Sequence, residues 1–295
     1  MKKTLGYRIA SVINIIIITF LCVLMIYPYL NQLAISLNDG KDTLLGGITI
    51  YPRKFTLENY KVIFRDPQIG HAAIISVTRT VLNVLFALFV TFSAAYALTR
   101  KNLVGRKFIT RYFCIPAYLT AGLIPTYILY RYLGLINNYW VYILPYGFTF
   151  YTFVILRSFI QEIPEALEES ALLDGANEIT VMFKIIIPLS LPALATVALW
   201  VAVGQWNDWT TTLYYITDSD LFPLQYVIMR IIKQGEQIKQ EALLSAMGAS
   251  QSQAVTTSES VKASMLIVTS VPIIMVYPFL QKYFVKGVTL GAVKG

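Results

Sequence analysis

The residues best able to do chemistry are gathered in one acidic stretch, residues 162–178. It holds six of the sixteen acidic residues in this chain of 295. Clustered carboxylates can transfer protons or, together with histidine or cysteine, hold a metal ion. The chain has one histidine, His71, and its two cysteines, Cys22 and Cys114, lie in apolar runs. The sequence therefore predicts neither a metal centre nor a catalytic triad, and binding is the chemistry left to the stretch.

Local signals within the acidic stretch predict two short helices joined at a sharp corner. Pro164 suits a first helical turn, where its missing N–H costs nothing, and the glutamates that follow complement the helix dipole. Gly175 is placed to end this helix in the left-handed conformation. Asn177 is expected to cap a second helix, residues 178–187, which Pro188 interrupts.

The rest of the chain has the composition of an integral membrane protein. Hydrophobic residues make up 56% of it and charged residues 14%, whereas a soluble domain carries about 25% charged residues. Its net charge of +8 does not favour nucleic-acid binding, because the basic residues flank apolar runs, as membrane topology requires. No G-x-x-x-x-G-K-[ST] loop occurs. We therefore expect no enzyme activity and no cofactor in this chain.

Six stretches lack Asp, Glu, Lys and Arg, and each has about 19 residues or more, enough to cross a hydrocarbon core of about 30 Å. The predicted fold is an all-α membrane protein with six transmembrane helices, within residues 9–38, 80–98, 112–130, 132–156, 185–207 and 263–281. Polar turn residues near Asn137 place the start of the fourth span near Tyr139. No small-x-small cleavage site follows the first run, which is therefore expected to be a retained helix rather than a signal peptide.

The loops between these stretches predict the orientation. Basic residues without acidic ones occur before the first span, between spans two and three, and in the C-terminal tail. The positive-inside rule then places both termini and residues 157–184 in the cytoplasm. Residues 38–71 and 210–262 form the outer connections. The first is expected to hold a short helix capped at Thr56, and the second a mobile polar run, residues 245–260.

An acidic surface helix on a membrane protein has two possible explanations. It can lie in the lipid headgroups, or it can dock into a partner protein. Helices at membrane surfaces favour Lys and Arg, which are attracted to anionic lipid. The negative charge of residues 162–178 favours docking into a basic groove of a cytoplasmic partner.

Residues 169–176, with Ile185, Pro188 and Leu189, resemble the EAA motif, E-A-A-x-x-D-G-A-x-x-x-x-x-F-x-x-I-x-x-P-L. This motif marks the permease subunits of binding-protein-dependent ABC importers. Ser170 replaces the first alanine, a small residue that should still pack, and Met182 stands where the motif has phenylalanine. The resemblance implies the type I ABC importer permease fold, with a coupling helix that inserts into a cleft on a dimeric cytoplasmic ABC ATPase.

The resemblance also implies three partner proteins. The ATPase would bind the ATP and Mg and hydrolyse the nucleotide, while Glu169 would pair with one of its basic residues and Asp174 and Gly175 would shape the corner. A second homologous permease subunit and an extracellular or periplasmic solute-binding protein complete such importers in the bacterial cytoplasmic (inner) membrane. The residues expected to couple to the ATPase are Glu168, Glu169, Ser170, Ala171, Asp174, Gly175 and Ala176.

Three further segments are similar to carbohydrate permeases of the maltose type, and most closely to the MalG-like branch. They are residues 94–100, the run Trp206-Asn207-Asp208-Trp209, and the tail from Gly287 onward. In that branch the extended tail reaches the ATPase, which implies contacts for Thr289, Gly291 and Lys294. The expected organisation is residues 1–71 for helix one and its loop, 72–284 for a permease core with a coupling loop at 161–190, and 285–295 for the tail.

The candidates for a sugar-contacting cavity combine polar and aromatic groups at the outer ends of spans two and five: Arg79, Gln205, Trp206, Asn207 and Asp208. Trp206 could equally belong to the interfacial aromatic belt, with Asn207 capping its helix. Arg79 is costly in a span unless it faces water, snorkels or pairs. It could face the cavity and neutralise an acidic sugar, reach outward to the interface, or pair with the second membrane subunit.

Two other functions are compatible with a multi-span chain. An ion-coupled secondary transporter usually has ionisable residues at midmembrane and an internal repeat. The six predicted spans contain no Asp or Glu, which argues against proton coupling. A membrane-embedded enzyme would need catalytic carboxylates or a metal cluster at one interface, and the acidic stretch has helix-and-corner spacing instead. The sequence therefore favours one membrane subunit of an ATP-driven importer for sugars or oligosaccharides.

Overall fold

A computed structural model describes residues 5–119, 121–245 and 258–292. These residues form helices and connecting loops, and the only strand-like pairing among them is an isolated bridge between Asn38 and Phe55. The chain divides into two compact units, Met1–Gly70 with Ile228–Val271, and His71–Val227 with Pro272–Gly295. Helices α4, α13 and α14 have residues in both units. The all-helical fold predicted from the sequence is therefore present throughout the described residues.

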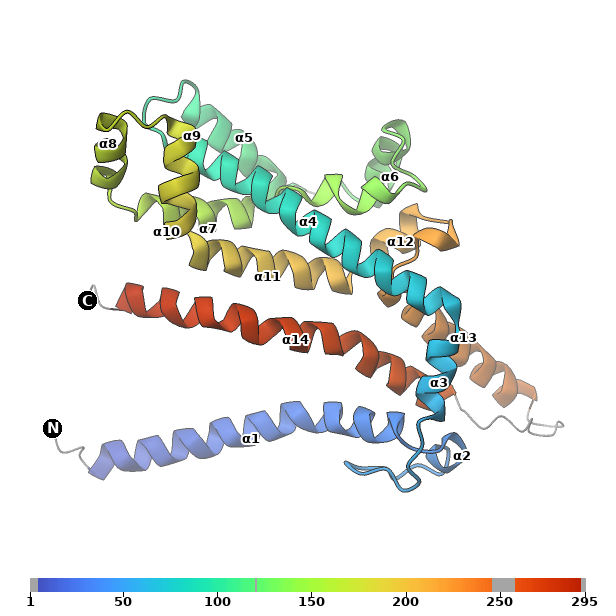
Figure 1. Cartoon of the computed structure of the whole chain (residues 1–295). Coiled ribbons are helices and arrows are strands. Elements are labelled where there is room, and N and C mark those ends of the chain that lie inside the picture. Colours follow the sequence, from blue (N-terminus) through green and yellow to red (C-terminus); the bar gives the residue numbers. More distant parts are fainter. Residues whose placement is uncertain (1–4, 120, 246–257, 293–295) are drawn as a thin grey trace. The chain divides into compact units, whose positions relative to one another are not determined.

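Figure 1 labels the elements along the chain. The long helices are α1 (Leu5–Ser36), α4 (Pro67–Thr99), α13 (Leu224–Ser245) and α14 (Ser258–Ala292), and the short helices of the first unit are α2 (Gly40–Thr43) and α3 (Glu58–Arg65). The remaining elements belong to the second unit: α5 (Arg106–Tyr118), α6 (Leu123–Tyr132), η1 (Tyr139–Tyr142), η2 (Leu144–Tyr146), α7 (Phe150–Gln161), α8 (Glu165–Leu173), α9 (Glu178–Val181), η3 (Met182–Ile186), α10 (Ile187–Leu189), α11 (Leu191–Asn207), α12 (Thr210–Tyr215) and η4 (Ser219–Leu221).

Three helices in the described residues are long and apolar enough to cross a membrane: Ile9–Ser36, Pro67–Thr99 and Glu259–Val276. Two further spans result if each of two bent pairs counts as one. Tyr139–Tyr146 joins Phe150–Gln161 at 48°, and Glu178–Leu189 joins Leu191–Asn207 at 77°. The protein is therefore a multi-pass membrane protein, in which several predicted spans are broken rather than straight.

The predicted third span, residues 112–130, is wrong as a single helix. Helix α5 ends at Tyr118 and α6 begins only at Leu123. Gly122, with a φ of +83°, precedes α6 in a conformation that residues with a side chain rarely adopt. Hydropathy alone did not reveal this break, because the residues on both sides of it are apolar.

The core of the second unit is built from aliphatic and aromatic residues of four helical segments. Ala95 in α4, Phe153 and Leu156 in α7, and Ile186 in η3 are fully buried, and Val197 of α11 is 1% exposed. Helix α7 packs against both α5 and α11. Because lipid tails are as apolar as these side chains, close van der Waals packing rather than exclusion of water holds the membrane-spanning helices together.

A close backbone approach accompanies the bend before α7. A Cβ atom at Gly147 would lie 2.3 Å from the Phe86 ring of α4, and the Thr91 hydroxyl donates to the Gly147 carbonyl at 3.4 Å. No residue with a side chain fits this position unless Phe86 moves. Glycine here lets the turn between η2 and α7 lie against α4.

The connection between α1 and α3 in the first unit is organised by Asn38. Its Nδ2 donates to Asp42 Oδ2 at 3.0 Å and to Thr43 Oγ1 at 3.1 Å, and its Oδ1 accepts from the Lys54 amide at 2.8 Å. The short helix predicted here begins at Glu58 with Leu57, rather than the predicted Thr56, at its N-cap. The Thr56 hydroxyl accepts from the Glu58 amide at 3.2 Å. Of the polar run 245–260, residues 246–257 lie outside the described residues.

Candidate functional site

The acidic stretch forms the predicted pair of helices around a glycine corner. Helix α8 starts one residue after Pro164, and Gly175 has a φ of +85°. The Asn177 side chain accepts from the Thr180 amide at 2.7 Å and caps α9. The predictions for Gly175 and Asn177 are confirmed, whereas Pro164 precedes the helix as its N-cap instead of lying in its first turn.

The corner presents both charge and apolar surface to its surroundings. Glu169, Asp174 and Gly175 are exposed, and beside them Leu173 is 89% exposed and Ile179 67% exposed. Leu173 and Ile179 thus give the corner an apolar surface beside its charges. We name this surface, made by Glu169, Leu173, Asp174, Gly175 and Ile179, the coupling corner.

The small residues of the motif differ in their burial. Ala171 and Ala176 are half-buried and pack against the core of the second unit, whereas Ser170 is exposed. The expectation that Ser170 packs like the alanine it replaces is therefore wrong. Met182 is half-buried against the same core, while Phe183 is 55% exposed. Met182 therefore takes the position that the motif gives to phenylalanine.

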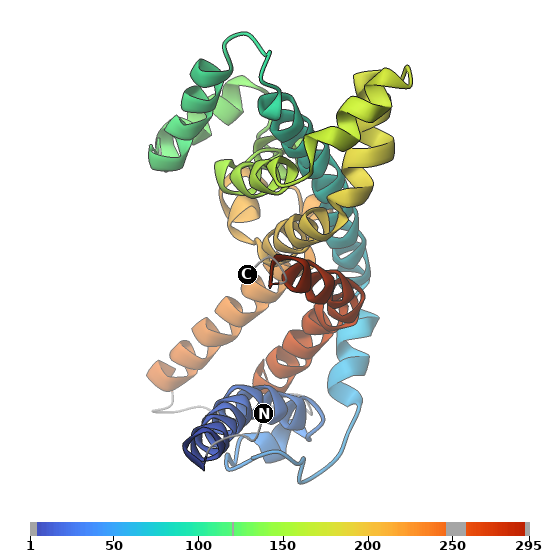
Figure 2. The ribbon, with the colours of Figure 1, turned by 90° about the vertical axis from the view of Figure 1, so that its left-hand side faces the viewer.

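Two carboxylates of α8 are engaged within the chain. Arg100, which follows the end of α4, donates to Glu168, whose side chain is 12% exposed, and the Arg100 guanidinium lies 4.1 Å from the centroid of the Tyr96 ring. Lys101 Nζ donates to Glu165 Oε2 at 2.9 Å, and this hydrogen bond lowers the pKa of the Glu165 carboxyl. Figure 1 and Figure 2 both show α8 and α9 at the end of the second unit where α4 meets the loop to α5.

This pairing corrects the interpretation of the acidic stretch as a free negative surface. Glu168 was expected to couple directly to a partner, but its carboxylate already bonds Arg100 of the same chain. The basic residues between α4 and α5 therefore position α8, in addition to any role in membrane orientation. Glu162, Glu169, Asp174 and Glu178 remain exposed, and two of them, Glu169 and Asp174, belong to the coupling corner.

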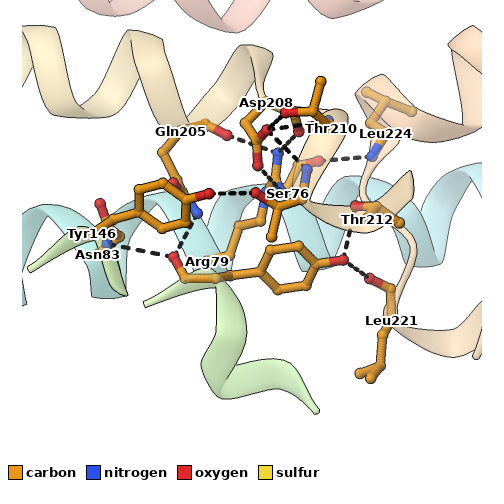
Figure 3. Close-up of polar contacts among 12 residues, drawn as sticks. Ser76, Arg79, Asn83, Tyr146, Gln205, Asp208, Thr210, Thr212, Leu221 and Leu224 are labelled. Carbon is orange, nitrogen blue, oxygen red and sulfur yellow. Dashed lines mark hydrogen bonds and ion pairs between the residues drawn. The ribbon is translucent and has the colours of Figure 1, made fainter. Parts of the chain in front are cut away.

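Arg79 belongs to a second polar site, at the opposite end of α11 (Figure 3). Its side chain is 0% exposed. Nη2 donates to the backbone carbonyls of Gln205 at 2.7 Å and Asp208 at 2.6 Å, and Nη1 lies 3.7 Å from Asp208 Oδ2. The guanidinium also lies 4.9 Å from the centroid of the Tyr142 ring. Arg79 thereby binds the unpaired carbonyls where α11 ends, which is where the helix dipole favours a cation.

None of the three placements proposed for Arg79 matches this geometry. The side chain does not reach the outer interface, does not line an open cavity, and is paired inside its own chain. The six predicted spans contain no Asp or Glu, and Arg79 instead pairs with Asp208, which lies one residue beyond the fifth predicted stretch. Burial requires a charge to be paired, and Asp208 with the α11 carbonyls supplies that pairing.

The other predicted cavity residues take structural positions in and around this site. Gln205 is 4% exposed and donates to the Tyr142 carbonyl at 2.8 Å. Asp208, rather than the predicted Asn207, is the C-cap of α11, and its Oδ1 accepts from the amides of Thr210 and Thr211 in the turn that starts α12. Trp206 is 8% exposed and not part of an exposed belt, and the exposed Asn207 donates back to the Val203 carbonyl at 2.9 Å.

Sequence reasoning missed the aromatic and amide residues that complete this site. The Tyr142 hydroxyl contacts the Thr212 hydroxyl at 2.9 Å and donates to the Leu221 carbonyl at 3.0 Å. Asn83 donates to the Ile143 carbonyl at 3.2 Å. Asn83, one turn from Arg79 on the same helix, was the one signal available, because a second polar residue in an apolar span also needs partners.

The C-terminal residues expected to contact the ATPase are only partly described by the structure. Thr289 and Gly291 lie within α14, which continues to Ala292, and Lys294 lies outside the described residues. Among the residues that the structure describes, no group of three His, Cys, Asp or Glu side chains could hold a metal ion.

Residues 5–290 match the family of binding-protein-dependent transport system inner membrane components. The chain belongs to this family. It is 35% identical over 295 residues to Protein LplC of Bacillus subtilis, covering all of this chain and 98% of that protein. It is 34% identical over 281 residues to the polygalacturonan/rhamnogalacturonan transport system permease protein YtcP of the same organism, covering 95% and 96% of the two chains. The protein is thus a transporter component rather than a catalytic enzyme.

More distant comparisons give the same fold. The trehalose/maltose transport system permease protein MalG of Thermococcus litoralis is 28% identical over 303 residues, covering the whole of both chains. The crystal structure of a bacterial ABC transporter that imports the acidic polysaccharide alginate contains a chain with a TM-score of 0.85 and 24% identity, covering 96% of this chain and 99% of that one. The fold is that of the ABC importer permeases.

Proposed function

We propose that this chain forms one half of the membrane pathway of an ATP-driven importer for sugars or oligosaccharides. It is a permease subunit of a carbohydrate ABC importer, in the family whose members include the saccharide permeases described above. The observation that carries the proposal is the exposed coupling corner, which a permease needs to receive force from a separate ATPase. An ion-coupled transporter has no use for such a corner, and the comparisons do not favour one.

The proposed topology has six spans with both termini in the cytoplasm. The bent pairs supply spans four and five, and α5 with α6 together supply span three across the break at Gly122. The basic segments at the N-terminus, between α4 and α5, and in the tail support the orientation through the positive-inside rule. The proposed organisation keeps residues 1–71, 72–284 and 285–295 as helix one with its loop, permease core and cytoplasmic tail.

The coupling corner is proposed to insert into a cleft of a dimeric cytoplasmic ABC ATPase, which binds ATP and Mg. Glu169 and Asp174 would meet basic residues of that cleft, while Leu173 and Ile179 would fill its apolar part. Ser170, Ala171 and Ala176 supply the small residues that let the corner approach closely. Thr289, Gly291 and Lys294 are proposed as a second ATPase contact.

The remaining partners follow from the family. A second homologous permease subunit would complete the pathway, and a solute-binding protein would deliver the saccharide from outside the bacterial cytoplasmic membrane. The family description itself names dependence on a binding protein. Since the chain has no phosphate-binding loop, nucleotide hydrolysis is assigned to the ATPase.

Co-purification from detergent tests this proposal. A tagged chain expressed with its genomic neighbours is expected to bring down a second permease and an ATPase in fixed stoichiometry. The complex with its binding protein in proteoliposomes is expected to take up saccharide only with ATP. A chain that transports alone, without an ATPase, would overturn the proposal.

A further inference from the structure

A pocket of about 380 Å³ lies in the second unit beside the capped turn that follows α11. Its walls come from the start of α6, from η2 and from α12, and the residues that matter below are Gly122, Thr126, Tyr146, Thr210, Thr211 and Tyr214. The volume falls within the range of about 300–1,000 Å³ that small-molecule sites occupy. The pocket combines hydroxyl groups with aromatic rings and was not predicted from the sequence.

Two threonine hydroxyl groups of this pocket, those of Thr126 and Thr210, have a definite hydrogen-bond polarity. Thr126 Oγ1 donates to the Gly122 carbonyl at 2.7 Å, and Thr210 Oγ1 donates to Asp208 Oδ1 at 2.8 Å. A hydroxyl group has a single hydrogen. Both threonines therefore present only acceptor lone pairs to the pocket, so a ligand held by them must donate hydrogen bonds.

The tyrosines supply both a fixed wall and an apolar face. The Tyr146 hydroxyl contacts the Thr211 hydroxyl at 2.6 Å, and Thr211 is 2% exposed, so Tyr146 is held in place. Tyr214 is 45% exposed, so part of its ring is accessible to a ligand. An aromatic ring beside hydroxyl acceptors suits the C–H surface of a sugar ring together with its hydroxyl donors.

Charge decides which class of sugar suits the pocket. None of the described residues that line it is Asp, Glu, Lys or Arg. Arg79, which shares Asp208 with Thr210, is fully buried and donates to the carbonyls of Gln205 and Asp208. A carboxylate ligand would find no cation here, and its oxygens would face threonine acceptors. Removing an ion from water without such compensation is costly.

We propose that this pocket is a saccharide subsite for one uncharged sugar unit, held by hydroxyl donation to Thr126 and Thr210 and by contact with Tyr214. The inference rests on the proposed function and deepens it, because it assigns substrate contact to this subunit. An acidic saccharide would have to place an uncharged unit here or obtain its cation from another chain.

The test is ATP-dependent uptake by proteoliposomes that hold the complete importer with its binding protein. The probes are radiolabelled maltotriose, galactotriose and trigalacturonate. Thr126→Val is expected to raise the KM for a transported neutral trisaccharide about three- to tenfold by removing one hydrogen bond. Tyr214→Ala is expected to raise it about tenfold. Thr126→Ser, which keeps the hydroxyl, and Tyr132→Ala, which alters an 87% exposed tyrosine of α6 outside the pocket, are expected to match the unsubstituted importer.

The possible outcomes distinguish failure of the subsite proposal from failure of the proposed transport function. Uptake by the unsubstituted importer with equal KM values in Thr126→Val and Tyr214→Ala would overturn the subsite alone. Transport of trigalacturonate only, with KM raised in these variants, would overturn its preference for an uncharged unit. If the unsubstituted importer takes up none of the three probes, the proposed function and the subsite both fall. The amount of intact complex, measured by size-exclusion chromatography, shows that each variant assembles.

Discussion

Arg79 of α4 and Asp208 at the end of α11 are partners within one chain: Arg79 Nη2 donates to the Asp208 carbonyl at 2.6 Å, and Nη1 lies 3.7 Å from its Oδ2. They are 129 residues apart in the sequence. The pair holds α4 against the turn between α11 and α12, which lies beside the proposed saccharide pocket. A charge inside a span thus serves to fix two helices, which accounts for its presence better than contact with substrate does.

Breaking this pair is expected to destabilise the subunit strongly. Arg79→Met would leave the Asp208 carboxylate and the α11 carbonyls without their donor, and removal of one partner of a buried pair costs about 3–5 kcal/mol. Asp208→Asn should cost less, because the amide oxygen can still cap Thr210 and Thr211. Thermal unfolding of the complex in detergent measures both. Arg131→Met, at an exposed arginine of α6, is the control, and equal stability of Arg79→Met with it would contradict the pairing.

The contact between Arg100 and Glu168 is expected to be necessary for coupling. Arg100→Glu should leave two carboxylates facing each other and displace α8, so that the ATPase turns over without uptake. The exchange Arg100→Glu with Glu168→Arg should restore uptake at least in part. Lys101→Glu, at the more exposed pair with Glu165, is the matched control and should have a smaller effect, because exposed ion pairs contribute little. Uptake and ATP hydrolysis measured on the same proteoliposomes decide the matter.

The glycine at the coupling corner is expected to be needed for its shape. Gly175→Val places a β-branched residue at a φ of +85°, where such residues are strained. Uptake should be lost while the subunit still inserts and assembles. Gly175→Asn should retain more uptake, because asparagine tolerates the left-handed region. Equal uptake by the valine and asparagine variants would show that the conformation is not required.

The contact between Gly147 and Phe86 is expected to control packing at the bend before α7. Gly147→Ala adds a Cβ 2.3 Å from the Phe86 ring and should cost about 1–3 kcal/mol through overpacking. Adding Phe86→Leu should recover part of that loss. Gly204→Ala, where a Cβ atom meets nothing within 4 Å, should leave thermal stability unchanged. Similar unfolding temperatures for the two alanine variants would refute the steric argument.

The sequence revealed those features that depend on neighbouring residues. Pro164, Gly175 and Asn177 each act within one or two turns, so the two short helices and their corner followed from local preferences. The predicted interruption at Pro188 is wrong, because helical structure continues through it to Leu189. The family resemblance rested on the same short segment. The apolar stretches likewise revealed a membrane protein, since span length depends only on composition.

Features that depend on distant contacts were not accessible in this way. Gly122 and Gly147 lie in apolar runs, so hydropathy does not show that the spans break there. The break at Gly122 appears in its φ of +83°, and the bend at Gly147 in its close approach to Phe86. The engagement of Glu168 by Arg100 joins residues 68 apart, and no pattern in either segment indicates it. The pocket at Thr126 and Thr210 could not be predicted either, because its walls come from three elements that are separate in the sequence.

Helix α4 is continuous from Pro67 to Thr99, and Arg100 follows it directly. Residues 79 and 100 are 21 positions apart, which corresponds to about 30 Å along a helix axis. Helix α4 therefore contacts α8 near its C-terminal end, through Arg100, and the end of α11 farther along, through Arg79. A tilt imposed where nucleotide is hydrolysed would act through this lever on the turn that walls the pocket. A rigid-body movement of α4 would then couple the α8 contact to the turn beside the pocket.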